Sequence, residues 1–275
     1  MSGQVRVGIS GWRYPAWRGD FYPTGLPQRR ELEYAADHLT SIEVNGSFYS
    51  LQRPSSYAAW RTEATRVKPA FVFSVKGPRY VSHLKRLKGV EIPLANFFAS
   101  GVLALGPALG PILWQLPENL RLDAAVLDEF LAGLPRSTTE AAELATRHDD
   151  KVPDDRALTA AEDHRPIHYA LEFRSASFAT AEADAVLRRH RIATVLADTA
   201  GRWPKVDQDT GPVRYVRLHG DQELYASGYT DRAVDEWADR CRGWSAAGQD
   251  VFVYFDNDVK GYAPRDAMRL IDRLT

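Results

Sequence analysis

Eight short apolar runs recur along the chain, and each one ends in polar or charged residues. Runs of this length bounded by turn residues predict β-strands. Strands that carry polar groups to their carboxyl ends are typical of a barrel with its functional site at one mouth. The predicted strands are Val5–Ile9, Ser41–Val44, Phe71–Val75, Ile112–Leu116, His168–Glu172, Thr194–Ala197, Val213–Leu218 and Val251–Phe255.

Apolar residues at helical spacing lie between most of these strands. Leu127, Phe130, Leu131 and Leu134 follow the i, i+3, i+4, i+7 pattern, and segments 183–190 and 267–274 repeat it. This alternation predicts a parallel sheet. Eight strands favour closure into a (β/α)8 TIM-type barrel over residues 1–275, with an open doubly wound sheet as the alternative.

Two segments depart from the regular alternation. Residues 199–212 are too short and too rich in Gly and Pro for a full helix, which makes the sixth unit irregular. Residues 137–166 are polar and acidic, with DDKVPDDR at their centre. This segment predicts a polar insertion before the fifth strand, made of a helix and a mobile surface loop.

Composition narrows the function classes. The chain has 275 residues, of which 44% are hydrophobic, and its net charge of −1 gives no overall basic field for nucleic acid or anionic membrane. Cys241 is the only cysteine, so neither an intrachain disulfide nor a cysteine-based zinc site can form. The first ten residues lack a signal core and no apolar stretch reaches spanning length, so we expect a cytoplasmic protein without membrane contact.

Strand parity predicts which side chains enter the barrel. Side chains alternate between the two faces of a strand, and in a barrel one face points inward. In the second strand Ile42 and Val44 face the helices, so Glu43 and Asn45 face inward. The other predicted inward residues at strand ends are Ser74, Lys76, Gln115, Glu172, Arg174, Tyr215, Arg217, His219, Tyr254 and Asp256, with Asp198 ending the sixth strand and Asn257 just beyond the eighth.

This set brings charges of both signs to one mouth. Glu43, Glu172, Asp198 and Asp256 are the carboxylates, and they face the cations Lys76, Arg174 and Arg217 together with His219. Burying an unpaired charge costs several kcal/mol, so the set predicts ion pairs, a bound ligand or both. Aromatic residues follow the same strands, Trp12 and Tyr49 among them, and aromatic walls around a few polar groups are typical of ligand pockets.

Seven strings occur in order and carry a resemblance. They are GISGWRYPAWRGDFYP (8–23), EVNGSFY (43–49), FSVKGPRYVSH (73–83), LWQLP (113–117), LEFR (171–174), VRLHG (216–220) and VYFDND (253–258). Together they resemble the domain of unknown function 72 family, also called YecE-like, over nearly the whole chain. The resemblance implies a TIM-type barrel with a polar site at the strand ends and no established activity. Members usually carry a histidine directly after the LEFR arginine. Here that position is Ser175, which counts against any mechanism that needs a histidine there.

Acid–base chemistry on a small anionic ligand is the favoured function, as in a hydrolase, lyase or isomerase. His219 is suited to proton transfer near neutral pH, and arginine and lysine to holding phosphate or carboxylate. The catalytic candidates are His219, Glu172, Asp256, Glu43 and Asp198. The ligand-binding candidates are Arg174, Arg217, Lys76, Asn45, Tyr49, Trp12, Gln115, Tyr254, Asn257 and His83.

Three alternatives stay open at this stage. His83 and His219 with a carboxylate could hold one divalent metal, as in a metal-dependent phosphodiesterase, although two histidines are few for such a site. A glycosidase with Glu43 and Glu172 flanking a sugar is disfavoured, because Gln115 and His219 end the fourth and seventh strands. The basic segment 76–88, which contains Tyr80 and His83, would suit single-stranded nucleic acid.

Overall fold

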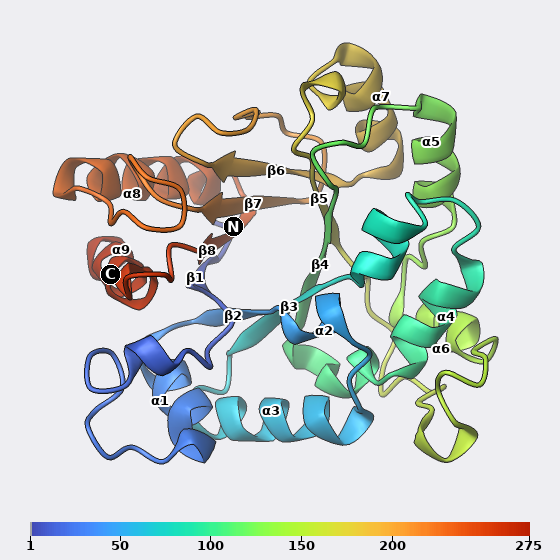
Figure 1. Cartoon of the computed structure of the whole chain (residues 1–275), viewed down its shortest axis with the longest axis horizontal. Coiled ribbons are helices and arrows are strands. Elements are labelled where there is room, and N and C mark those ends of the chain that lie inside the picture. The colour runs from blue at the N-terminus through green and yellow to red at the C-terminus, as the bar shows by residue number, and fades with distance from the viewer. Residues whose placement is uncertain (1) are drawn as a thin grey trace.

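Eight parallel strands form a closed barrel in sequence order, each hydrogen-bonded to the next. A computed structural model describes residues 2–275 (Figure 1). Pairing of Val5 with Val251 and of Ile9 with Phe255 closes the ring, so the barrel prediction is confirmed and the open sheet is excluded. The strands are β1 (Val5–Ser10), β2 (Ser41–Val44), β3 (Val72–Lys76), β4 (Leu109–Gln115), β5 (Tyr169–Glu172), β6 (Ala193–Asp198), β7 (Val213–Leu218) and β8 (Asp250–Phe255).

Helices surround the strands on the outside of the ring (Figure 1). The helical patterns at 127–134, 183–190 and 267–274 correspond to α5, α7 and α9. No helix within residues 2–275 is both long enough and apolar enough to cross a lipid bilayer. The helices are α1 (Glu31–His38), α2 (Gly46–Tyr49), α3 (Pro54–Val67), α4 (Glu91–Ala99), α5 (Ala124–Ala132), α6 (Thr138–Ala145), α7 (Ala181–His190), α8 (Asp231–Ala246) and α9 (Tyr262–Leu274).

The two irregular segments behave differently in the structure. Residues 199–212 contain no helix, as predicted for the sixth unit. The insertion begins with α6, which packs against α4, and continues through a short 3-10 turn at Asp154–Arg156. Asn96 of α4 and Asp149 of the insertion exchange two hydrogen bonds of 2.8 and 2.9 Å. These reciprocal bonds fix the insertion to the barrel wall.

Two apolar clusters lie on the two faces of the barrel. The larger one fills the space between strands and helices and includes Trp17, Trp114 and Trp237. The smaller one fills the barrel interior and consists of Val72, Leu113, Ala170, Ala193, Val195, Ala197, Val213, Tyr215, Phe252 and Tyr254. This interior set has the predicted parity. Tyr254, expected at the ligand, instead lies within this layer, where its hydroxyl contacts Ser74 and Ser41 at 2.8 and 2.7 Å.

Gly77 is a position where the packing leaves no room for a side chain. A Cβ built there lies 2.3 Å from the ring of Trp114, which is completely buried. We expect Gly77→Ala to lower the free energy of unfolding by roughly 1–3 kcal/mol through overpacking. Denaturant unfolding would measure the change. Gly243→Ala is the matched control, because that α8 position has open space and alanine favours a helix. A Gly77→Ala chain as stable as the parent would contradict this packing.

Candidate active site at the carboxyl ends of the strands

The guanidinium of Arg217 lies at the centre of the predicted cluster. This β7 side chain is completely buried, and three carboxylates surround it: Glu43 on β2, Glu172 on β5 and Asp256 directly after β8. Its nitrogen atoms lie 2.9 Å from Glu43 Oε1, 2.7 Å from Glu172 Oε2 and 2.9 Å from Asp256 Oδ2. One cation therefore contacts all three acidic groups, and the strand ends that parity placed inside the barrel lie together.

Each glutamate has further hydrogen-bond donors. Glu43 accepts from the hydroxyls of Ser10 at 2.5 Å and Tyr215 at 2.6 Å. Glu172 accepts from Gln115 Nε2 at 2.9 Å and from Arg174 Nε at 3.1 Å. Burial would raise the pKa of Glu172, but the charges of Arg217 and Arg174 outweigh it and hold that pKa well below its usual range.

His219 follows β7 and is also completely buried. Its Nε2 lies 3.4 Å from Arg217 Nη1, and its Nδ1 lies 3.0 Å from Asp256 Oδ2. Because a guanidinium can only donate, we assign the imidazole proton to Nδ1, on the side of Asp256. The Nδ1 contact is close but poorly aligned for a hydrogen bond, so it is mainly electrostatic. Both ring nitrogens thus face protein groups.

Two carboxyl groups of the β8–α9 loop have pKa values displaced in opposite directions. Burial would raise the pKa of Asp256, but the Arg217 charge and His219 hold it far below its ordinary value. Burial and the neighbouring Asp256 charge raise the pKa of Asp258, against a hydrogen bond from Tyr14. Strand parity does not predict Asp258 as a site residue, because the alternation of side chains holds only within the strand. Its place in the acidic run at 256–258 was the only signal.

Lys76 is the cation of the cluster that lacks a partner. Its side chain is 8% exposed, and it forms no ion pair or hydrogen bond with any residue in the described part of the chain. Its Nζ lies 4.3 Å from the centre of the Phe48 ring. Burial and the nearby Arg217 charge lower the pKa of Lys76 to about 8. The ammonium therefore has no acceptor within residues 2–275 and stays in contact with solvent at the mouth.

Two aromatic residues position Arg174 at the mouth. The Arg174 guanidinium lies 3.7 Å from the centre of the Trp203 ring, and it donates to the Tyr225 hydroxyl at 3.1 Å. Trp203 comes from the loop after β6 and Tyr225 from the loop after β7. Trp203 lay in a segment identified only as irregular, so nothing in the sequence pattern pointed to it.

Several predicted residues lie at the edge of the cluster or outside it. Asn257 turns away toward α9, where its amide donates to Asp266 at 2.9 Å. The Asp198 carboxylate pairs with Lys205 at 3.2 Å, and within residues 2–275 it forms no hydrogen bond or ion pair with the cluster. Asn45 donates to Ser10 Oγ at 2.8 Å. Burial and the Lys76 charge lower the pKa of His83 to about 4.

Ser175 occupies the position where a histidine was expected from the resemblance. Its hydroxyl accepts from the backbone N–H of Ser177, and its Oγ lies 2.9 Å from Ser177 Oγ. It therefore caps the short 3-10 helix at Ala176–Phe178. The side chain contributes to the local turn after β5, and the neighbouring Arg174 reaches the cluster independently of it.

A metal would need donors that converge on one point. Within residues 2–275 no three His, Cys, Asp or Glu side chains are arranged to hold an ion. The carboxylates that were candidates for a metal face Arg217 instead, and His83 contacts Ser82 at 2.9 Å. The residues present therefore do not fit the metal-dependent phosphodiesterase hypothesis.

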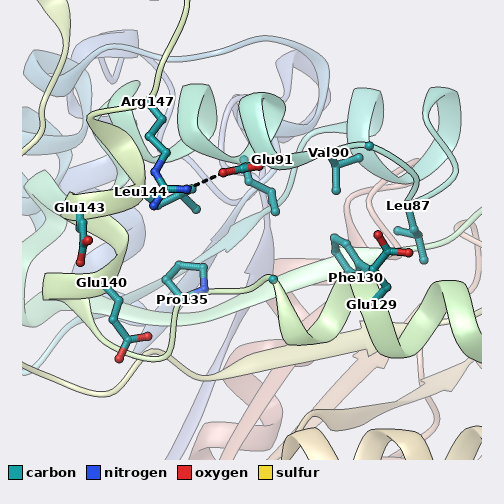
Figure 2. A pocket seen from close by; sticks show the side chains of 13 residues that line it. Leu87, Val90, Glu91, Glu129, Phe130, Pro135, Glu140, Glu143, Leu144 and Arg147 are labelled. Carbon is teal, nitrogen blue, oxygen red and sulfur yellow. Dashed lines mark hydrogen bonds and ion pairs between the residues drawn. The ribbon is translucent and has the colours of Figure 1, made fainter.

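Cavities lie on both sides of Tyr49, next to the mouth. The smaller cavity, of about 340 Å³, is lined by Trp12, Tyr14 and Asn45. The larger cavity, of about 580 Å³, is lined by Phe48 and Tyr80. Tyr49 lines both. A third cavity of about 510 Å³ lies between α4, α5 and α6 (Figure 2). None of the strand-end residues lines this third cavity. Its lining is acidic and therefore unsuited to an anion; Arg147 is paired with one of the four glutamates, which are Glu91, Glu129, Glu140 and Glu143.

Removing the central cation should destabilise the fold. We expect Arg217→Met to lower the free energy of unfolding by roughly 3–5 kcal/mol, because Glu43 would stay buried without an ion-pair partner and Glu172 would keep only Arg174. Chemical denaturation at pH 7 would measure this change. Arg232→Met is the control, since its pair with Glu236 is largely exposed and should have little effect. Similar stability in both variants would contradict the proposed role of Arg217.

The same network predicts how stability depends on pH. The folded-state pKa values of Glu172 and Asp256 lie below the ordinary carboxyl value of about 4. Their contribution to stability is therefore fully present above pH 4–5 and is lost as the pH falls, since the unfolded chain binds protons first. The denaturant concentration at the unfolding midpoint would be measured from pH 7 down to pH 3. It should fall more steeply with falling pH for the parent than for Arg217→Met. The same pH dependence in both proteins would contradict the network.

Comparisons with known proteins agree on the family. The family model described as "Protein of unknown function DUF72" matches residues 6–275. UPF0759 protein YecE of Escherichia coli K12 is 28% identical over 132 residues, which cover 48% of this chain and 44% of that protein. The aligned part thus spans less than half the length of the curated relative.

Solved structures show the same fold. A DUF72 family protein of Thermotoga maritima has a TM-score of 0.76 and 22% identity, covering 98% of this chain and 99% of that one. D-psicose 3-epimerase of Clostridium cellulolyticum H10, solved with D-tagatose, has a TM-score of 0.52 and 11% identity, covering 98% of each chain. At these identities the likeness shows the barrel alone. The chain belongs to the DUF72 family, because the family model spans nearly all of it.

Proposed function

We propose that the chain binds a small phosphate- or carboxylate-bearing ligand at the carboxyl ends of its strands and acts on it by acid–base chemistry. The observation that carries this proposal is Lys76, whose side chain is largely buried while its ammonium still reaches the solvent and has no acceptor among the described residues. The other central charges already have partners inside the protein. An anionic ligand would supply the acceptor that Lys76 lacks.

Arg174 supports the same anion position. It forms its ion pair with Glu172 through Nε and donates to Tyr225 through Nη2, and its Nη1 donates to no protein group within residues 2–275. Both Arg174 and Lys76 lie close enough to Glu172 to lower its pKa. A ligand anion that contacts these two cations would sit over the glutamate at the centre of the mouth.

The two aspartates of the β8–α9 loop suit different roles. Arg217 holds Asp256 ionised, so Asp256 is a weak base and supplies a fixed negative charge. Burial and the Asp256 charge raise the pKa of Asp258, which makes it the better proton acceptor of the two. We therefore assign proton exchange to Asp258. The amine of Lys76, with a pKa of about 8, can also exchange a proton near neutral pH.

His219 takes a positioning role in this proposal, in place of the direct proton transfer expected from the sequence. Its ring is completely buried and both nitrogens face Arg217 and Asp256. It can therefore orient Asp256 without touching the ligand. Proton transfer at a carbon or at a leaving oxygen corresponds to an isomerase, lyase or hydrolase, and we propose this class of enzyme.

Substitution of Lys76 tests the anion site. Inorganic phosphate, simple carboxylates and phosphate monoesters would be titrated calorimetrically into the parent and into Lys76→Met. We expect the variant to lose roughly 10- to 100-fold in affinity, the effect of one charge-assisted hydrogen bond. It should keep its folding stability, because burial already disfavours the ammonium. Parent affinity should also fall as the pH rises through about 8, where the amine loses its proton.

Lys88→Met is the matched control, because Lys88 is exposed and belongs to the same basic segment. Its affinity should equal that of the parent. Equal affinity of Lys76→Met and the parent for every anion, or binding that does not change between pH 7 and 9, would refute the proposal.

A further inference from the structure

An apolar groove opens beside the candidate active site. The cavity of about 580 Å³ lies between α2, the segment that follows β3, and the start of α4. Of the six large hydrophobic side chains exposed within residues 2–275, four line it: Tyr49, Tyr80, Leu84 and Ile92. Soluble proteins seldom gather exposed apolar groups in one hollow without a ligand or partner.

The backbone that presents two of these side chains is unusual. Tyr80–Leu84 forms a single π-helical turn, a feature often found at functional sites. Arg86 and Leu87 follow with φ values of 53° and 70°, which residues with a side chain rarely adopt. The N–H of Leu87 donates to the carbonyl of Val81 at 3.1 Å and holds this geometry. The fold thus maintains a costly turn that places Tyr80 and Leu84 on the groove.

The charge around the groove is positive. Arg79, Lys85 and Lys151 line it, and residues 71–90 contain no Asp or Glu. Asp149 is the acidic lining residue, and its carboxylate accepts from Asn96 at 2.8 Å and from the Lys151 N–H at 3.0 Å. An apolar hollow with a cationic rim complements a molecule that has an apolar part and a negative group.

The groove and the unpaired lysine share one wall residue. Phe48 lines the groove, and its ring lies 4.3 Å from Lys76 Nζ. Tyr49 lines both the groove and the smaller cavity, which Trp12 and Asn45 line as well. A ligand that contacted both Lys76 and the groove would therefore have to pass beside the Phe48 ring.

We propose that the ligand is an amphipathic anion whose acidic head binds at Lys76 and whose alkyl or acyl tail lies in this groove. This inference rests on the proposed function and names its substrate class. Leu84 and Ile92 offer aliphatic surface to such a tail, beside the exposed rings of Tyr49 and Tyr80.

A chain-length series tests the tail and the head separately. Ethyl, butyl, hexyl and octyl phosphate would be titrated calorimetrically into the full chain below their micelle concentrations. We expect parent affinity to rise roughly three- to fourfold for each methylene until the groove is filled. The double variant Leu84→Ser/Ile92→Ser should keep its affinity for ethyl phosphate and lose most of the rise. Both residues are at least partly exposed, so the variant should fold.

Lys76→Met should weaken all four phosphates by the same factor and leave the rise per methylene unchanged. Val259→Ser is the control for surface apolarity, because Val259 is exposed but does not line the groove. A parent affinity independent of chain length would overturn the groove inference and leave the anion site standing. Long phosphates that bind Lys76→Met as well as the parent would overturn the anion site. Oligothymidylate that binds more tightly than octyl phosphate and weakens steeply with salt would overturn the tail in favour of nucleic acid.

Discussion

The buried guanidinium of Arg217 is the interaction on which the mouth of this barrel depends. A charge taken out of water costs several kcal/mol, and its partners recover that cost only with good geometry and further hydrogen bonds. Glu43, Glu172 and Asp256 provide the partners from different strands, and Ser10 and Tyr215 satisfy the remaining oxygen atoms of Glu43. The network can form only when β2, β5, β7 and the end of β8 are in register. It therefore links the packing of the fold to the geometry of the site.

The apolar layer beneath the network explains why the polar groups gather at one end. Val72, Leu113 and Phe252 are among the residues that fill the barrel interior, so polar side chains lie toward the carboxyl ends of the strands. Tyr254 marks the boundary, since its ring belongs to this layer and its hydroxyl bonds to the serines of neighbouring strands. Charges placed above this boundary are screened poorly, and each therefore has a large effect on the pKa values of the others.

Sequence periodicity predicted the strands and the inward set because both follow from local geometry. The period of two in β2 or β7 is enough to place Glu43 and Arg217 on one face, and chain closure then brings them together. The same reasoning fails one residue after a strand ends. Asn257 was expected at the ligand and packs on α9 instead, whereas Asp258, which was not selected, approaches Asp256. Loop conformation depends on tertiary contacts, and a periodic pattern carries no information about them.

Pairing inside the network also determines which groups are available to a ligand. Arg217 was expected to bind an anion, but its donors are directed at three carboxylates and His219, so a ligand would have to break bonds that already stabilise the fold. Lys76 received the same prediction from the same parity and differs only in having no acceptor. The sequence cannot distinguish these two cations, because it does not show which of them has carboxylates within contact distance in the folded chain. The unpaired cation lies against Phe48, and Phe48 is also a wall of the apolar groove. A cation without an acceptor and an apolar groove therefore meet at one residue, which is the physical basis for expecting a ligand with both characters.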